Sequence, residues 1–218
     1  MKKIFYAASL MAATMFASCG GGAQKSQEAE STEDVSGPPK STVVDNPEVD
    51  LSQFETDSEG YIVIFNGKDF TGWRGYGKDK VPGKWTIEDG AIKFNGSGCG
   101  EAQDGDGGYL IFSHKFQNFE LLLDWKVSKG GNSGIFYLAQ EISTTDENGN
   151  ERMEPIYISA PEFQVLDNAN HPDAKLGKDN NRQSASLYDM IPAVPQNQNP
   201  FGEWNSAKIM VYKGTVVH

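Results

Sequence analysis

The sequence predicts an antiparallel β-sandwich that forms a single domain. Short segments rich in β-branched and aromatic residues alternate with Gly, Asn and Asp turn signals, and no amphipathic pattern is long enough for more than two helical turns. The 218 residues suit one domain of this class, and 24 Gly with 10 Pro are typical of a turn-rich β-protein. We therefore expect several antiparallel strands and few helices.

The N-terminal residues 1–19 are predicted to be an export signal, because a basic start is followed by a short apolar run and small residues. The stretch from Phe16 to Cys19 resembles a bacterial lipoprotein cleavage box, which would make Cys19 the lipidated mature N-terminus. Several acyl chains would anchor the protein stably to a membrane of the cell envelope, on its periplasmic or outer-surface side. A plain secretory signal is the alternative.

Residues 20–50 contain few large apolar side chains, so they are predicted to form a disordered acidic tether before a domain at 51–218. The net charge of -11 argues against a nucleic-acid partner. With Cys19 lipidated, Cys99 has no disulfide partner, and no His nearby in the sequence suggests an activated thiol.

The domain begins with a β-branched run at 61–65, which is predicted to be a strand that ends at the turn Asn66-Gly67. Asp89-Gly90 is a strong hairpin signal between two short strands. A further strand is expected at 109–114. Together these elements predict an antiparallel meander.

The next strand, within 116–127, alternates cleanly between apolar and polar positions. Leu123 and Trp125 fall on one face, whereas Asp124 falls on the other with Glu120. Asp124 is a candidate second carboxylate for catalysis, although a salt-bridged or solvated sheet residue is the alternative.

Alternation recurs at residues 161–168, where Phe163 and Val165 share one face and Glu162 and Gln164 share the other. A carboxylate and an amide side by side suit a polar ligand such as a sugar, but an ordinary solvated sheet face has the same pattern. The following stretch, 171–182, has no periodicity and is expected to be a long loop of the kind that is often functional.

Six blocks in this order resemble the 3-keto-disaccharide hydrolase domain family over about residues 58–218. They are 64–73, 118–126, 131–137, 162–168, 185–189 and 204–205. The resemblance implies an exported bacterial protein with a jelly-roll sandwich of the concanavalin A-like lectin and glucanase type, and a sugar cleft on its concave sheet. The family pattern continues beyond His218 with further strands, so the resemblance implies a chain that is truncated at its C-terminus and has an uncovered sheet edge.

The activity that the resemblance implies is cleavage of glycosides already oxidised to a ketone at C3 of the sugar. Such a ketone acidifies the C2 hydrogen, so a base can remove it, the C1 leaving group departs and water adds back. Glu162 is the candidate base, with Gln164 as a hydrogen-bond partner of the sugar. His171 could supply an acid or a base from the loop, whereas most loop histidines are simply solvated.

Further substrate-binding residues are predicted at the same surface. Asn132 and Ser133 in a Gly-bounded turn could donate to sugar hydroxyls, and Tyr188 could stack on a sugar ring. Asp167 at the end of the Glu162 strand is a fourth candidate. A structural turn and buried aromatic packing are the competing interpretations.

Other chemistries are compatible with the same residues. Direct hydrolysis by two carboxylates would require a separation of about 5 Å or of roughly 6.5 to 9.5 Å. No cofactor is certain. A divalent metal could be held by His114, Glu162 and His171, and Asp104 with Asp106 resembles half of a calcium loop. A non-catalytic carbohydrate-binding surface lipoprotein is the alternative to an enzyme, and a scaffold with neither activity is a third reading.

Overall fold

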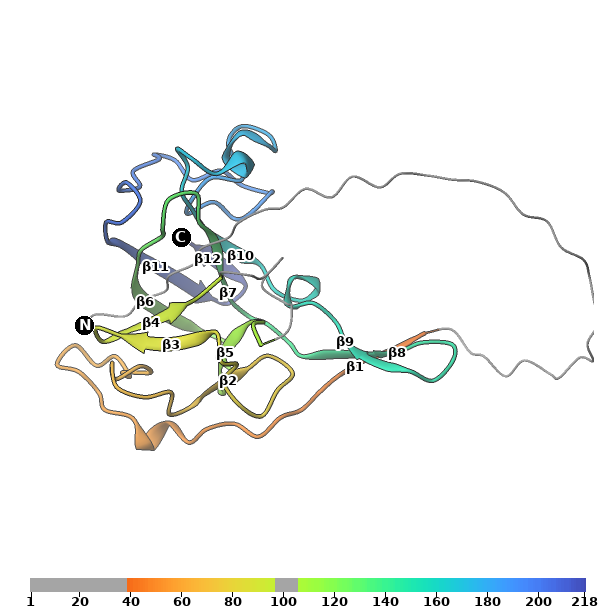
Figure 1. Cartoon of the computed structure of the whole chain (residues 1–218). Helices are drawn as coiled ribbons and strands as arrows, with labels where there is room; N and C mark the ends of the chain where they lie inside the picture. Colours follow the sequence, from red (N-terminus) through yellow and green to blue (C-terminus); the bar gives the residue numbers. More distant parts are fainter. Residues whose placement is uncertain (1–38, 97–105) are drawn as a thin grey trace, which may run out of the picture.

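The computed structural model describes residues 39–96 and 106–218, and its regular structure is almost entirely antiparallel β (Figure 1). The strands are β1 (Lys40–Val43), β2 (Trp73–Gly75), β3 (Trp85–Glu88), β4 (Ala91–Phe94), β5 (Leu110–Phe112), β6 (Phe119–Trp125), β7 (Asn132–Phe136), β8 (Ile142–Thr145), β9 (Glu151–Met153), β10 (Glu162–Leu166), β11 (Asn205–Tyr212) and β12 (Thr215–Val217). The 3₁₀ turns are η1 (Leu51–Gln53), η2 (Ile156–Ile158) and η3 (Pro172–Lys175).

The strands pair into small sheets that stack as layers. Their orders are β12-β11-β6, β10-β7, β2-β5, β3-β4 and β1-β8-β9. The first two share one buried core, and in Figure 1 the β2-β5 pair lies below the β10-β7 sheet while the β3-β4 pair lies below β6. The predicted antiparallel sandwich of jelly-roll type is confirmed.

The main core fills the space between the β12-β11-β6 sheet and the β10-β7 sheet. Trp125 of β6, Ile209 of β11 and Val165 of β10 are at most 2% exposed there. Full burial of an aliphatic side chain of this size contributes about 1.5–3 kcal/mol. The predicted apolar faces of β6 and β10 are therefore the faces that form the core.

The hairpin signal at Asp89-Gly90 is confirmed. It joins β3 to β4, and both turn residues have positive φ, 51° and 74°, as a two-residue type I′ turn requires. The left-handed backbone explains the glycine, which adopts it without a steric penalty.

The strand predicted at 61–65 does not form. Ile62 makes only an isolated bridge to Thr56, and the Ile64 carbonyl accepts a hydrogen bond from the Trp73 indole at 2.7 Å. A β-branched run favours a strand, but among the described residues this run pairs only with the short segment 55–57.

The predicted tether is too long at its C-terminal end, because residues 40–50 belong to the fold. Strand β1 pairs with β8, and Asn46 donates to the Glu141 carboxylate at 2.5 Å. Glu141 also accepts two bonds of 2.6 Å from Arg74, so Asn46 attaches the N-terminal segment to a largely buried ion pair of the body. The remainder of the tether, the export signal with Cys19, Cys99 and Asp104 lie outside the described residues.

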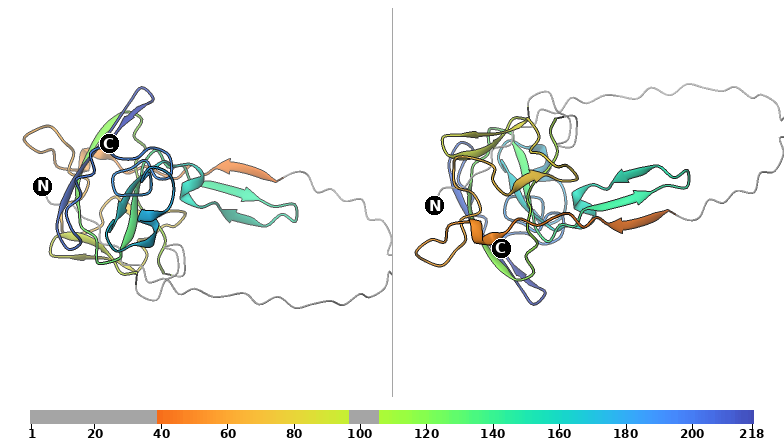
Figure 2. Two further views of the ribbon diagram at one scale, coloured as in Figure 1. Left: turned by 90° about the horizontal axis from the view of Figure 1, so that it is seen from above. Right: turned by 90° about the horizontal axis from the view of Figure 1, so that it is seen from below.

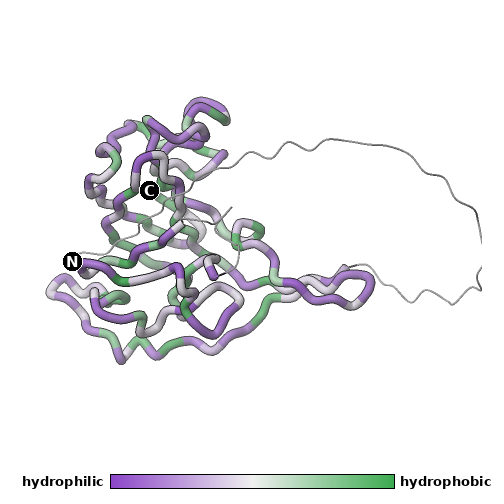
Figure 3. Tube along the Cα trace, in the orientation of Figure 1, coloured by the Kyte–Doolittle hydropathy of each residue, from purple (hydrophilic) through white to green (hydrophobic). Residues whose placement is uncertain are grey.

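Strands β1, β8 and β9 form an arm that projects from the body (Figure 2). Its outer part is mainly hydrophilic, whereas apolar residues alternate along the body strands (Figure 3). Within 39–96 and 106–218 there is no helix of sufficient length and apolarity to span a bilayer.

Candidate active site on the β10-β7 sheet

The register of β10 and β7 decides which side chains share the candidate site. Glu162 lies opposite Phe136, Gln164 opposite Gly134, and Leu166 opposite Asn132. Directly opposed residues in an antiparallel pair point to the same side. Glu162, Gln164 and Asn132 therefore lie on the face that is turned away from the main core.

A distant segment extends this face on the other edge of β10. The Tyr188 N–H donates to the Glu162 carbonyl at 3.0 Å, and the Gln164 N–H donates to the Ser186 carbonyl at 3.1 Å. Leu187 bridges Phe163, so Tyr188 and Ser186 alternate in phase with Glu162 and Gln164. The phenol of Tyr188 is thereby brought beside the Glu162 carboxylate.

Gly134 provides the space that the Glu162 carboxylate occupies. A Cβ atom added at Gly134 would lie 1.8 Å from Glu162 Oε1 and 2.5 Å from its Cδ. Atoms do not approach that closely, so any side chain at this position would displace the carboxylate. The site depends on a glycine one strand away from its acid.

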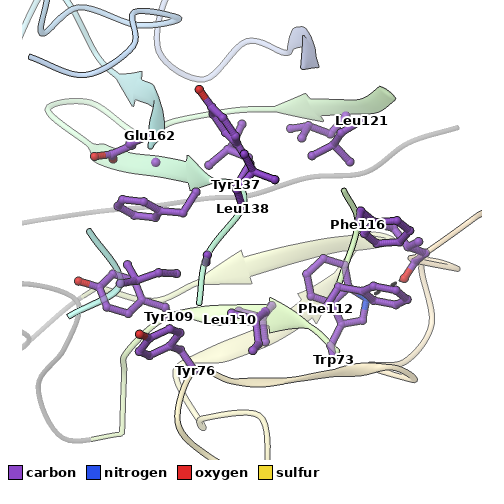
Figure 4. Close-up of a pocket in the computed structure, with 18 of the residues that line it drawn as sticks. Trp73, Tyr76, Tyr109, Leu110, Phe112, Phe116, Leu121, Tyr137, Leu138 and Glu162 are labelled. Atoms are coloured by element: carbon purple, nitrogen blue, oxygen red, sulfur yellow. Dashed lines mark hydrogen bonds between the residues drawn. The ribbon is translucent and has the colours of Figure 1, made fainter. Parts of the chain in front are cut away.

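Glu162 opens onto a cavity of about 2110 Å³ between the β10-β7 sheet and the opposing layer. Figure 4 shows Glu162 on one wall and the aromatic rings of Tyr76 and Tyr109 on the other. Gln164, His171 and Tyr188 also line it. A large, mostly apolar cavity with a few convergent polar groups is typical of a small-molecule site.

The loop that follows β10 covers the polar end of this cavity. His171 is only 5% exposed and caps η3, since its Nδ1 accepts from the Asp173 N–H at 3.2 Å. The Tyr188 hydroxyl donates to Asp173 Oδ2 at 2.9 Å, and Arg182 donates to Asp173 Oδ1 at 3.0 Å. Arg182 also forms a two-bond pair with Asp189, both bonds being 2.8 Å.

Electrostatic interactions keep the Tyr188 phenol and the Arg182 guanidinium in defined protonation states. Burial and the hydrogen bond to Asp173 raise the pKa of the Tyr188 phenol. Hydrogen bonds to Asp189 and Asp173 raise the pKa of Arg182. Tyr188 is therefore a neutral phenol and Arg182 a cation throughout the neutral pH range.

Comparison with known proteins identifies the family. Residues 60–218 match the family model described as the 3-keto-alpha-glucoside-1,2-lyase-like domain. The chain belongs to this family. It is 69% identical over 221 residues to a protein of Bacteroides thetaiotaomicron (strain VPI-5482) named 3-keto-disaccharide hydrolase, an alignment that covers 100% of this chain and 76% of the relative.

A solved structure supports the same fold for this member of the lyase-like family. It is a crystal structure from Parabacteroides distasonis ATCC 8503, described as a candidate glycosyl hydrolase. The TM-score is 0.55 at 28% identity, and the match covers 73% of this chain and 67% of that one.

Two predicted site residues of this family member lie on other sheet faces than Glu162. Asp124 accepts from Ser206 Oγ at 2.6 Å on the outer face of β6, so the main core separates it from Glu162. Ser133 opposes Val165 and points to the core side of the sheet. Their side chains therefore do not share the face of Glu162.

Asp167 is also misplaced by the sequence reasoning. It is 2% exposed, and its carboxylate accepts from the Gly130 N–H at 2.7 Å and the Asn170 amide at 2.8 Å. Its oxygens hold the two turns that flank β7 and β10. Asp167 is thus a structural residue beneath the site.

Gln164 faces the cavity as predicted but is covered more than expected. It is 1% exposed, and its Oε1 accepts from the Val165 N–H at 2.9 Å. Its side chain is consequently fixed in one orientation, with the carbonyl oxygen already engaged.

The predicted metal set of His114, Glu162 and His171 does not assemble, whereas Asp104 of the other set lies outside the described residues. In the described part of the chain, no three His, Cys, Asp or Glu residues lie close enough to hold an ion. His114 lies at the N-terminal segment, with its Nδ1 2.9 Å from Glu48 Oε2, and not with Glu162 and His171. Asp106 accepts from the Gly83 N–H at 2.9 Å.

Sequence reasoning missed Gly134, Asp173 and Arg182. The length of the 171–182 loop signalled a functional segment, but nothing in its composition paired Asp173 with Tyr188. The clearance at Gly134 becomes visible only once β7 and β10 are in register.

Proposed function

We propose that this chain is an enzyme that cleaves glycosides whose sugar carries a ketone at C3. The relative named 3-keto-disaccharide hydrolase, at 69% identity, supports a hydrolase that acts on 3-keto sugars. The structural observation that carries the proposal is the Glu162 carboxylate, set into the space over Gly134 on a covered sheet face that lines the cavity.

The proposed reaction is an elimination followed by hydration. A base takes the C2 proton, whose acidity comes from the C3 ketone, and the electron pair forms the C1–C2 double bond as the C1–O bond breaks. The departing oxygen takes a proton from an acid. Water then adds its oxygen to C1 while C2 regains a proton, so the net change is hydrolysis.

Glu162 suits the role of the base, because its carboxylate is fixed on the cavity wall. His171 suits the role of the acid. Since Nδ1 accepts from the Asp173 N–H, the neutral ring carries its proton on Nε2. Asn132 and Tyr188 suit the role of hydrogen-bond partners of the sugar, because both lie on the face of Glu162. Positioned acid and base groups each contribute about 10² to 10⁴-fold in rate.

The test is product analysis with methyl 3-keto-α-D-glucopyranoside. The unaltered chain should release methanol and 3-ketoglucose, and Glu162→Gln should lose that activity while its circular dichroism stays unchanged. Saturable binding without product would favour the non-catalytic carbohydrate-binding alternative. Turnover that survives Glu162→Gln would remove Glu162 as the base.

We also propose that the protein is exported and anchored through a lipid on Cys19, with the domain held at the cell envelope. Support comes from the basic, apolar and small-residue order of residues 1–19. Expression in a bacterial host followed by membrane fractionation checks this. Cys19→Ser should move the protein from the membrane to the soluble fraction, and retention in the membrane would contradict lipid anchoring.

A further inference from the structure

The Tyr188 hydroxyl has a fixed polarity, which here means that it always donates its hydrogen bond to the same partner. Its single proton is directed at Asp173 Oδ2, at 2.9 Å. The other oxygen of Asp173 accepts from Arg182 at 3.0 Å, so the carboxylate is held at both ends. A phenol has one proton and can accept through its lone pairs, so with that proton engaged its remaining capacity is as an acceptor.

The partners of Asp173 make this polarity stable. Arg182 can only donate, so the carboxylate oxygen that faces it must remain an acceptor. The guanidinium is itself fixed by two bonds to Asp189 and lies over the Tyr188 ring, 5.4 Å from the ring centroid. Reversing the Tyr188 bond would require Asp173 to carry a proton beside a cation.

The location of Tyr188 makes this polarity relevant to a ligand. Its backbone runs beside Glu162, and both side chains line the cavity. A sugar whose C2 hydrogen approaches Glu162 would therefore present neighbouring oxygens to Tyr188.

We infer that Tyr188 accepts a hydrogen bond from a sugar hydroxyl of the substrate, and that Asp173 is a positioning residue that sets this polarity. The inference rests on the proposed function, because it specifies which sugar oxygens the same site reads. A ketone oxygen has no proton to donate, so the C3 ketone cannot be the partner of Tyr188. The site would thus distinguish the hydroxyls of an oxidised sugar from its ketone.

The test measures hydroxyl preference by calorimetry. The probes are methyl 3-keto-α-D-glucopyranoside and its analogues with fluorine in place of the hydroxyl at C2, C4 or C6, because fluorine does not donate. All variants carry Glu162→Gln to stop turnover, and the sugar is analysed after each titration. At one ring position the hydroxyl should bind about three- to tenfold more tightly than fluorine.

Two substitutions then separate polarity from simple packing. Tyr188→Phe should abolish the preference at that position. In Asp173→Asn the amide oxygen stays towards Arg182 and the NH₂ group donates to Tyr188, which turns the phenol proton towards the cavity and should weaken or reverse the preference. The matched control is Asp189→Asn, which removes one of the two bonds between Arg182 and residue 189 but leaves the Asp173–Tyr188 bond unchanged, so the preference should remain.

A preference that persists in Asp173→Asn or in Tyr188→Phe would overturn the inference. Failure of the Glu162→Gln protein, which retains Tyr188, to bind any of these sugars would also overturn it. A uniform loss of affinity for every probe in Asp173→Asn would show a merely structural role and would also overturn it. Binding without the preference contradicts this inference alone. Absence of product from the unaltered chain contradicts the proposed function alone.

Discussion

Strands β10 and β6 have the same alternation of apolar and polar side chains, but their polar faces have different surroundings. Each carries an acid on the face opposite to its core residues, Glu162 on β10 and Asp124 on β6. The acid face of β10 is extended at one edge by the 186–188 segment, is flanked by the loop after the strand, and lines the cavity. The acid face of β6 carries an exposed pair between Asp124 and Ser206. Alternation therefore defines a polar face, and distant segments decide whether that face becomes a site.

The largest expected effect tests this contrast directly. Glu162→Gln should lower turnover of a 3-keto glycoside by about 10² to 10⁴-fold, because the amide cannot take the C2 proton. Asp124→Asn, the matched change on β6, should leave turnover within about twofold. Steady-state kinetics checks both, and equal losses in the two variants would erase the distinction between the faces.

A second change disturbs the β10 face without touching its acid. Gly134→Ala places a Cβ where the Glu162 carboxylate lies, 1.8 Å from Oε1, and should cost about 10²-fold in turnover through misplacement of the base. Ser133→Ala, on the core side of the same strand, is the control and should retain activity. Full activity of Gly134→Ala would mean that the position of Glu162 is not critical.

Removing a buried carboxylate should destabilise the protein more than removing an exposed one. Glu141 is 8% exposed and accepts from Arg74, Asn46 and the Gly77 N–H, so Glu141→Gln should lower the free energy of unfolding by about 2 kcal/mol. Glu120→Gln removes an exposed pair between Glu120 of β6 and Lys208 of β11, so it should lower the free energy of unfolding much less than Glu141→Gln. Urea denaturation measures both, and a reversed order would contradict the structure.

The same carboxylate predicts a pH dependence. Burial acts to raise the pKa of Glu141, but hydrogen bonds from Arg74, Gly77 and Asn46 hold this pKa below its ordinary value of 4.5. A lowered folded-state pKa stabilises the fold above the unfolded value, and this contribution is lost as the pH falls through the folded value. The difference in Tm between the unaltered chain and Glu141→Gln should therefore shrink from about pH 6 to about pH 3. A constant difference would argue against an ionised Glu141.

Much of the fold could be read from the sequence, because alternation and turn chemistry are local. The faces of β6 and β10 and the Asp89-Gly90 hairpin needed no tertiary information. The segment at 61–65 failed because strand formation also needs a partner. Residues 40–50 looked like a tether by composition, yet polar contacts to Glu141 hold part of this segment to the body.

The site was only partly predictable for a related reason. Glu162 and Gln164 share the predicted face, and His171 and Tyr188 join them. Asp124 and Ser133 lie on other faces, because the direction of a side chain depends on which side of each strand is buried. Asp173 could not be found, since its importance comes from a contact with Tyr188 fifteen residues away.

Isotope incorporation tests the central claim, that Glu162 removes the C2 proton. The chain is incubated with methyl 3-keto-α-D-glucopyranoside in heavy water, and the released 3-ketoglucose is examined by mass spectrometry and proton NMR. Enzyme-free product and Glu162→Gln measure the background exchange at C2. The account predicts one deuterium at C2 in every product molecule at early times. Product formed with hydrogen retained at C2 would contradict it and would indicate direct displacement at C1.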